Sequence, residues 1–200
     1  SGARFAGLVA EHHDGFAMWD SDHTPFNSLD MGPRRDVTLE LEKAIRKRGM
    51  KFFASLHHSF NYTALEIKEG WAADDKKYER LYGSMMDREE WLTMWLNKCN
   101  EVVDKYHPDI MYFDAWLDDI PEEYIKKYLA HYFNEAELNG QNVAVTYKGD
   151  DLPSEVGMLD HENSNPDEFM KEPWLCDYSI GTGISYAWGY TEGMQIRTPK

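Results

Sequence analysis

The stretch FAGLVAEHHDGF, residues 5–16, sets an apolar run directly before two histidines and an aspartate. An apolar run of this length is typical of a buried β-strand, so we expect His12, His13 and Asp14 where that strand ends. The same order of apolar run and polar end recurs in three later segments: KFFASLHH (51–58), IMYFDAW (110–116) and NVAVTYKG (142–149). The four segments predict buried strands whose carboxyl ends carry reactive or hydrogen-bonding side chains.

Segments with helix start and stop signals separate these strands. Each begins at an N-capping side chain or a proline and ends before a glycine or a proline. The expected helices run from Asp36 to Gly49, from Asp87 to Pro108 and from Pro121 to Leu138. Two shorter strands are expected in LCDYSIG (175–181) and SYAWGY (185–190), whereas GDDLPSEVGMLDHEN (149–163) is expected to be a loop.

The alternation of strands and helices predicts parallel strands covered on both faces. The sequence contains neither GxGxxG nor GxxxxGK[ST], which counts against a nucleotide-binding sheet. Polar residues at the carboxyl ends of four strands favour a (β/α)8, TIM-like barrel, because active sites are built at that edge. A complete barrel needs about 250 residues. We therefore expect residues 1–200 to form one catalytic barrel domain that is incomplete, with early strands missing before Ser1.

The charge balance restricts the partners. The chain has 21 Lys and Arg against 36 Asp and Glu, a formal net charge of −15. This surface repels phosphate backbones, so nucleic acid and anionic membranes are not expected as partners. No apolar run approaches the ~18 residues of a membrane span. Cys99 and Cys176 lie far apart in the sequence and are expected to be buried thiols, not a disulfide or a metal site.

The histidine pair of HHDGF has two interpretations. Two metal ligands on one strand are usually two residues apart, and these histidines are adjacent, which favours neutral imidazoles that hydrogen-bond sugar hydroxyls. Asp14, followed by Gly15, is expected to form a turn. At the end of the next strand, His57 is expected to face the barrel mouth and His58 to pack behind it.

Asp114 stands in the apolar segment MYFDAW, where an ionised carboxylate is costly unless it has a partner. A catalytic role is therefore favoured over a buried cap or a partner for a lysine. Asp118 and Asp119 are expected to cap the following helix. Glycoside hydrolysis would require a second carboxylate. The segment 149–163 offers five, and composition does not choose among them: Asp150, Asp151, Glu155, Asp160 and Glu162.

Four stretches together resemble the α-L-fucosidases of glycoside hydrolase family 29. They are EHHDGFAMWDS (11–21), FNSLDMGPRRDVTLELEKAIRKRGMKF (26–52), YHPDIMYFDAW (106–116) and PWLCDYSIGTGISYAWGY (173–190). The distance between the HHDGF and GPxRD motifs is specific to the family, and the late W-x-C motif supports the resemblance independently. The stretches span almost the whole chain in the family's order.

The resemblance implies a retaining exo-glycosidase that releases terminal α-L-fucose and needs no metal or cofactor. It implies Asp114 as the nucleophile and Glu162 as the general acid, with Glu155 as the alternative acid. The implied substrate is a fucosylated oligosaccharide or glycoconjugate, in a secreted, periplasmic or lysosomal protein, and self-association into a homo-oligomer stays open. The implied sugar-binding side chains are His12, His13 and His57, with Trp116 or Trp19 against the apolar face of the sugar.

The chain departs from the family pattern at two places. Ala115 stands where the family usually has glycine after the nucleophile. VTYKGD stands where many members have Asn-Asp-Arg-Trp-Gly, so Lys148 would bind substrate in place of an arginine, although a point charge cannot reproduce a guanidinium fork.

Two rival functions remain at this stage. One is a metal-dependent barrel hydrolase that uses His12, Asp14, His57 and Asp114. The other is a fucose-binding fragment without turnover.

Overall fold

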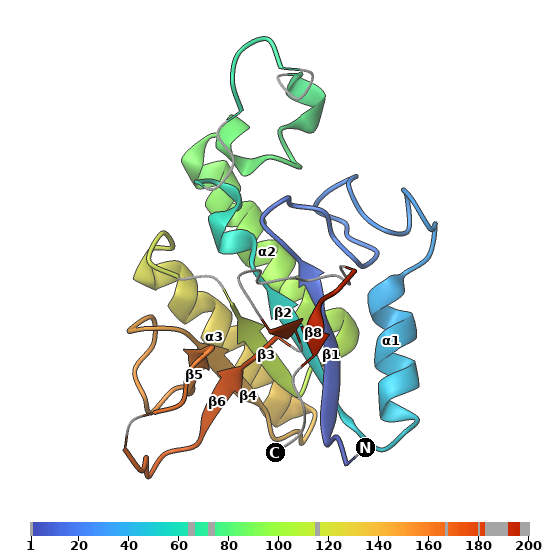
Figure 1. Cartoon of the computed structure of the whole chain (residues 1–200). Coiled ribbons are helices and arrows are strands. Elements are labelled where there is room, and N and C mark those ends of the chain that lie inside the picture. Colours follow the sequence, from blue (N-terminus) through green and yellow to red (C-terminus); the bar gives the residue numbers. More distant parts are fainter. Residues whose placement is uncertain are drawn as a thin grey trace.

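The computed structural model describes residues 2–63, 67–71, 75–114, 117–166, 168–179, 181–182 and 192–196. Six parallel strands form one sheet in sequence order. They are β1 (Phe5–Glu11), β2 (Lys51–Leu56), β3 (Ile110–Phe113), β4 (Ala144–Tyr147), β5 (Met158–Glu162) and β6 (Trp174–Asp177). The sheet curls as a half-barrel with its helices on the outer side (Figure 1). This agrees with part of a (β/α) barrel.

Three α-helices connect the first four strands. They are α1 (Val37–Arg46), α2 (Arg88–Tyr106) and α3 (Glu122–Leu138). Three short 3₁₀ helices occupy the long β2–α2 connection, at His58–Asn61, Lys76–Tyr78 and Gly83–Met85. In Figure 1 this connection stands above the carboxyl ends of the strands. A further antiparallel pair consists of β7 (Gly181–Thr182) and β8 (Gln195–Ile196).

The core lies between the sheet and the helices. One face of α2 is fully buried and carries Trp91, Trp95, Cys99 and Val102. Trp95 packs on Phe113 of β3 with ring centroids 6.3 Å apart. This contact packs α2 against the carboxyl end of β3.

The expected N-caps are confirmed for two of the three helices. The Asp36 side chain accepts a hydrogen bond from the Leu39 amide, and Asp87 accepts from the amides that follow it at the start of α2. The expected caps of α3 are wrong: Pro121 is its N-cap, with no side-chain cap bond. Asp119 instead accepts a hydrogen bond from the Thr63 hydroxyl at 2.8 Å, which takes its carboxylate to a neighbouring loop.

The segment 149–163 is not entirely a loop, because its end forms β5 in register with β4 and β6. The sequence did not predict this strand because Asp160 and Glu162, which point toward the site, interrupt the apolar run that usually marks a strand. Just before the strand, Gly157 approaches β4 so closely that a Cβ atom there would lie 2.8 Å from the Val145 carbonyl. LCDYSIG gives most of β6 and the first residue of β7, while SYAWGY lies outside the described residues.

Both cysteines are free thiols, as expected, but only Cys99 is buried; Cys176 is half-buried. Among the described residues, no helix combines the length and apolar composition that crossing a membrane requires.

Candidate active site

The carboxyl ends of five neighbouring strands, β1 to β5, meet at a cavity of about 700 Å³. Its wall combines imidazoles, carboxylates and one lysine. The lining residues used below are His12, His13, His57, Asp114, Lys148, Asp160 and Glu162. The expectation that polar residues at separate strand ends come together is confirmed for these side chains. Trp116 lies outside the described residues.

A β-bulge at the end of β1 decides which way the first histidines point. The register with β2 shifts between Val9 and Glu11, so Glu11 is paired with Leu56 and shares its orientation toward the helices. The next residue, His12, therefore points to the opposite side, into the cavity. Asp14 accepts a hydrogen bond from the Phe16 amide and forms the turn expected of it.

Three imidazoles gather on this side of the cavity. The His12 ring stacks on His57 with centroids 4.3 Å apart, and His13 Nδ1 lies 3.0 Å from the His57 carbonyl oxygen. Burial lowers the pKa of His57 to about 3, and it also lowers the pKa of His12. These two rings are neutral at pH 7 and can donate to and accept from hydroxyl groups.

The partner histidine at the end of β2 faces away, as expected. His58 is buried on the helix side, where its Nε2 atom lies 3.4 Å from the Trp95 carbonyl and 3.7 Å from the Cys99 thiol. Burial lowers the pKa of His58 to about 3. It therefore belongs to the layer behind the cavity.

Asp114 lies directly beyond β3, between an imidazole and an ammonium group. Its Oδ2 atom is 3.0 Å from His57 Nε2, and its Oδ1 atom is 2.5 Å from Lys148 Nζ. Burial raises the pKa of Asp114, against the lowering effect of Lys148. The carboxylate is thus placed by two strands and is neither a helix cap nor a solvent-exposed group.

Lys148 is the cation of the site. Its Nζ atom lies 3.3 Å from carboxylate oxygens of Asp160 and Asp177, and it also contacts Glu162. Burial alone would lower the pKa of Lys148, but Asp114 and the neighbouring carboxylates raise it. One ammonium group therefore faces four carboxylates, and the site has an excess of negative charge.

The Tyr112 hydroxyl lies within hydrogen-bond distance of three carboxylates of the site. Its hydroxyl lies 2.7 Å from Asp160 Oδ2, 3.1 Å from Asp177 Oδ2 and 3.2 Å from Asp114 Oδ1. It has one proton, so it donates to one carboxylate at a time. Sequence reasoning missed Tyr112 and Asp177. The two-residue period of the strands was the available signal, since Tyr112 precedes Asp114 by two positions on the same face.

Several candidate residues are separated from the cavity. Trp19 is completely buried, and its indole donates to Glu101 at 2.8 Å, so the expectation that it packs on a sugar is wrong. Glu155 is exposed on the β4–β5 connection and does not line the cavity. Glu162, whose side chain is 40% exposed, lies at the cavity on the last position of β5.

Within the described part of the chain, two groups of side chains could in principle hold a metal ion. One is His12, His13 and His57; the other is Asp114, Asp160, Glu162 and Asp177. The second group already surrounds the Lys148 ammonium, which takes the place that a cation would need. The rival metal set drawn from the sequence is not brought together, since Asp14 belongs to neither group.

Comparisons with known proteins show which family the chain resembles. A sequence model described as α-L-fucosidase matches residues 1–200. The plasma α-L-fucosidase of Rattus norvegicus is 26% identical over 98% of this chain and 41% of its own length. The plasma α-L-fucosidase of Homo sapiens is 29% identical over 70% of this chain and 28% of its own length. The chain thus spans well under half of these relatives.

Solved structures show the same fold. A structure described as an α-L-fucosidase superimposes with a TM-score of 0.70 at 25% identity, covering 97% of this chain and 42% of that one. The α-fucosidase of Thermotoga maritima gives a TM-score of 0.67 at 21% identity, covering 98% and 42%. At that identity the second likeness concerns the fold alone.

Proposed function

Since this chain belongs to the α-L-fucosidase family, we propose that the protein containing it hydrolyses terminal α-L-fucose from glycans with retention of configuration. The single observation that carries the proposal is the pairing of Asp114 and Glu162 across one lysine, at the mouth of a cavity rimmed by neutral imidazoles. The proposed substrate is a fucosylated oligosaccharide or glycoconjugate, a neutral sugar that suits an acidic site.

Asp114 is the nucleophile of the proposed reaction. Its carboxylate attacks the anomeric carbon, the bond to the leaving oxygen breaks, and a covalent fucosyl-enzyme forms. Lys148, 2.5 Å from Asp114 Oδ1, favours the ionised carboxylate against the burial that disfavours it. The reaction needs no metal or cofactor.

Glu162 is the proposed general acid. It protonates the leaving oxygen and then accepts a proton from the incoming water. Its exposed position at the end of β5 leaves room for the leaving group, whereas the side chain of Asp160 is fully buried. Asp114 and Glu162 each place an oxygen within 4.8 Å of the other. This supports retention, for which the two carboxyl groups stand roughly 5–5.5 Å apart, over inversion, which needs roughly 6.5–9.5 Å.

His12, His13 and His57 are the proposed sugar-binding groups. The neutral imidazoles of His12 and His57 bind hydroxyls without the cost of desolvating a second charge. Lys148 reaches the same cavity and would contribute a hydrogen bond to the substrate. Trp116 is retained as a proposed contact on the sugar face.

The decisive test is Asp114→Gly, assayed on an aryl α-L-fucoside with and without azide. We expect turnover to fall by roughly 10³-fold or more, and azide to restore it by forming the β-fucosyl azide in the space that the carboxylate leaves. Asp109→Asn, at the other end of β3, is the control and should keep turnover.

Three results would contradict the proposal. Undiminished turnover by the Asp114→Gly variant would remove Asp114 as the nucleophile. Loss of activity on dialysis against a chelator, with recovery on adding Zn²⁺, would favour the metal-dependent alternative. Fucose binding by the unmodified protein without any hydrolysis would favour the binding fragment.

A further inference from the structure

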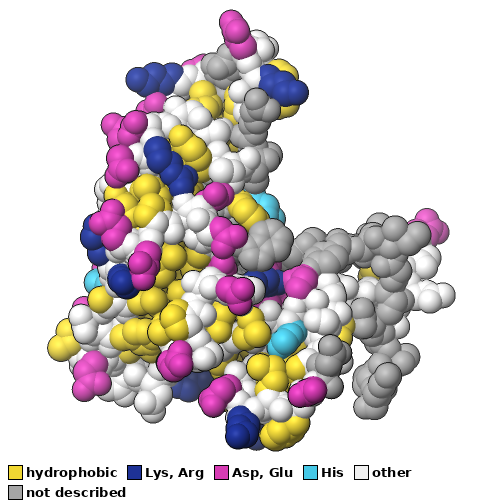
Figure 2. Space-filling model, turned by 90° about the vertical axis from the view of Figure 1, so that its left-hand side faces the viewer, with side chains coloured by type: hydrophobic (Ala, Val, Ile, Leu, Met, Phe, Trp, Pro, Cys, Tyr) yellow, Lys and Arg dark blue, Asp and Glu magenta, His cyan; other side chains and the backbone are white. Residues whose placement is uncertain are grey.

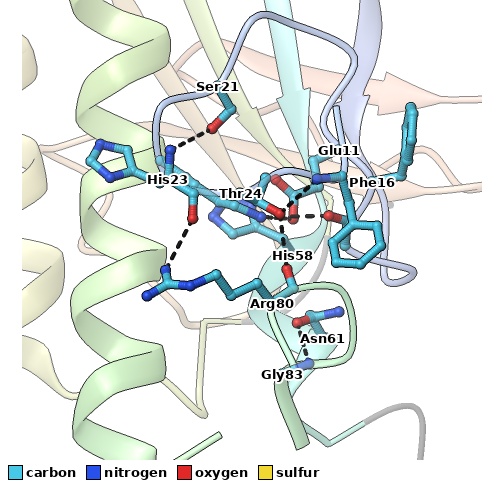
Figure 3. A network of polar contacts seen from close by, with 12 residues as sticks. Glu11, Phe16, Ser21, His23, Thr24, His58, Asn61, Arg80 and Gly83 are labelled. Atoms are coloured by element: carbon cyan, nitrogen blue, oxygen red, sulfur yellow. Dashed lines mark hydrogen bonds and ion pairs between the residues drawn. The ribbon is translucent and has the colours of Figure 1, made fainter. Parts of the chain in front are cut away.

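A buried ion pair lies directly behind the histidine rim. Glu11 and Lys98 are each 1% exposed, and Lys98 Nζ lies 2.8 Å from Glu11 Oε1. Glu11 ends β1, one residue before His12, and Lys98 stands on α2. Figure 3 labels Glu11 and His58 in a close view of the polar contacts in this part of the molecule. The mechanism proposed above uses neither Glu11 nor Lys98.

Stability alone is a weak explanation for such a pair. Removing two charges from water costs several kcal/mol per ion, and an apolar pair of similar volume is often as stable. The cost is visible here: burial raises the pKa of Glu11 to about 7, against the lowering effect of Lys98. The pair therefore points to a requirement for definite geometry at the end of β1.

Lys98 also reaches the turn that follows the histidines. Its Nζ atom lies 3.5 Å from the Gly15 carbonyl oxygen, and the Gly15 amide donates to the His12 carbonyl at 3.1 Å. Gly15 has φ = +77°, and a Cβ atom there would lie 2.0 Å from the Leu81 carbonyl. The same ammonium thus contacts both the residue before the histidine pair and the turn after it.

Asn61 holds the other side of the same turn. Its amide nitrogen donates to the carbonyls of His13 and Leu81, each at 2.9 Å. Its amide oxygen accepts from the Gly83 amide at 2.8 Å, a bond drawn in Figure 3. The turn is therefore fixed by side chains from both the 58–61 segment and α2, and Lys98 is the one that carries a charge.

We propose that Lys98 is a positioning residue for the sugar-binding imidazoles: through Glu11 and the Gly15 carbonyl it holds His12 and His13 in the orientation that receives the fucose ring. This inference rests on the proposed function. Lys98 itself is buried and does not line the cavity, so it acts only through the backbone on either side of the histidines.

The main variant is Lys98→Met, which keeps the length and removes the charge. A misplaced binding group weakens the bound states in general, so we expect KM for an aryl α-L-fucoside to rise roughly 10-fold with kcat changed little. The melting temperature should fall as well, because Glu11 is left buried without its partner.

The double variant Glu11→Gln/Lys98→Met separates positioning from stability. It removes both charges, so we expect the melting temperature to recover. KM should stay high, because methionine cannot donate a hydrogen bond to the Gly15 carbonyl. Asp109→Asn is the matched control: it breaks the ion pairs of a buried carboxylate at the amino end of β3 and should lower the melting temperature while KM stays at the wild-type value.

The ring signals of His12 and His13 in ¹H–¹⁵N spectra of the full-length protein supply a readout independent of turnover. We expect them to shift in both Lys98 variants and to stay in place in Asp109→Asn. Unshifted ring signals, or a KM that recovers with the melting temperature in the double variant, would overturn the inference. Absence of fucoside turnover in the wild-type protein would instead overturn the proposed function, while the ring signals would still decide the role of Lys98.

Discussion

The two ends of β3 each carry a shielded aspartate, and the two carboxylates have opposite surroundings. Asp109, just before the strand, faces two cations: Arg46 Nη1 lies at 2.8 Å and Lys51 Nζ at 2.6 Å. Asp114, just after the strand, shares the single ammonium of Lys148 with three other carboxylates. Cations therefore outnumber carboxylates around Asp109, whereas carboxylates outnumber cations around Asp114.

The pKa values follow this difference. Burial alone would raise the pKa of Asp109, but hydrogen bonds from Lys51 and the Phe52 amide, together with Arg46, lower it. Burial raises the pKa of Asp114, because Lys148 does not fully offset it. A carboxylate with a lowered pKa and several cationic partners suits a structural role, whereas a carboxylate whose pKa is raised by burial is typical of reactive sites.

Among variants that leave both aspartates of this comparison unchanged or change only its structural end, Lys148→Met should give the largest effect, because it removes the only cation that the described residues place among these carboxylates. We expect kcat/KM to fall by roughly 10²–10³-fold. The pKa of Asp114 would rise further, so the acidic limb of the kcat/KM profile should move to higher pH. A pH–rate profile on an aryl α-L-fucoside measures both. An unmoved acidic limb would show that Lys148 does not set the ionisation of Asp114.

Asp109→Asn should affect stability and leave catalysis alone. We expect the free energy of unfolding to drop by about 2 kcal/mol, since the hydrogen bonds to a charged partner are lost while Arg46 and Lys51 still reach water. Urea denaturation gives the stability and initial rates give kcat/KM. A clear change in kcat/KM under folding conditions would mean that the two ends of β3 are not independent.

His58→Gln should have a smaller effect, visible only in acid. The pKa of His58 is about 3 in the folded protein against 6.5 when exposed, so the neutral ring contributes stability above pH 6.5 that is lost as the pH falls toward 3. The loss approaches about 1.4 kcal/mol per pH unit for one such group.

Urea denaturation at pH 6.5, 5.5 and 4.5 tests this expectation, and the variant should lose stability less steeply than the wild type. Equal slopes would mean that His58 is not kept neutral by folding. At the amino end of β3, Asp109 should keep its contribution to the free energy of unfolding over this whole pH range, because its lowered pKa leaves the carboxylate ionised.

Most of the framework was predictable from local signals. The first four strands, the three helices and the caps Asp36 and Asp87 lie where apolar runs and capping residues placed them. Strand β5 was missed because its inward positions, Asp160 and Glu162, are polar. The prediction that Asp119 caps α3 was wrong because its carboxylate accepts a hydrogen bond from Thr63, a residue that is distant in the sequence.

The sequence by itself determined the parallel sheet, the family resemblance and the residue types at the carboxyl ends of the strands. These features follow from the spacing of apolar residues and from local motifs, and both involve residues that are close together in the sequence. Only the tertiary structure decided which carboxylates meet Lys148, that Tyr112 and Asp177 join them, and that Trp19 is removed from the cavity. Those outcomes depend on strand register, the β1 bulge and burial, which bring together side chains that are distant in the sequence.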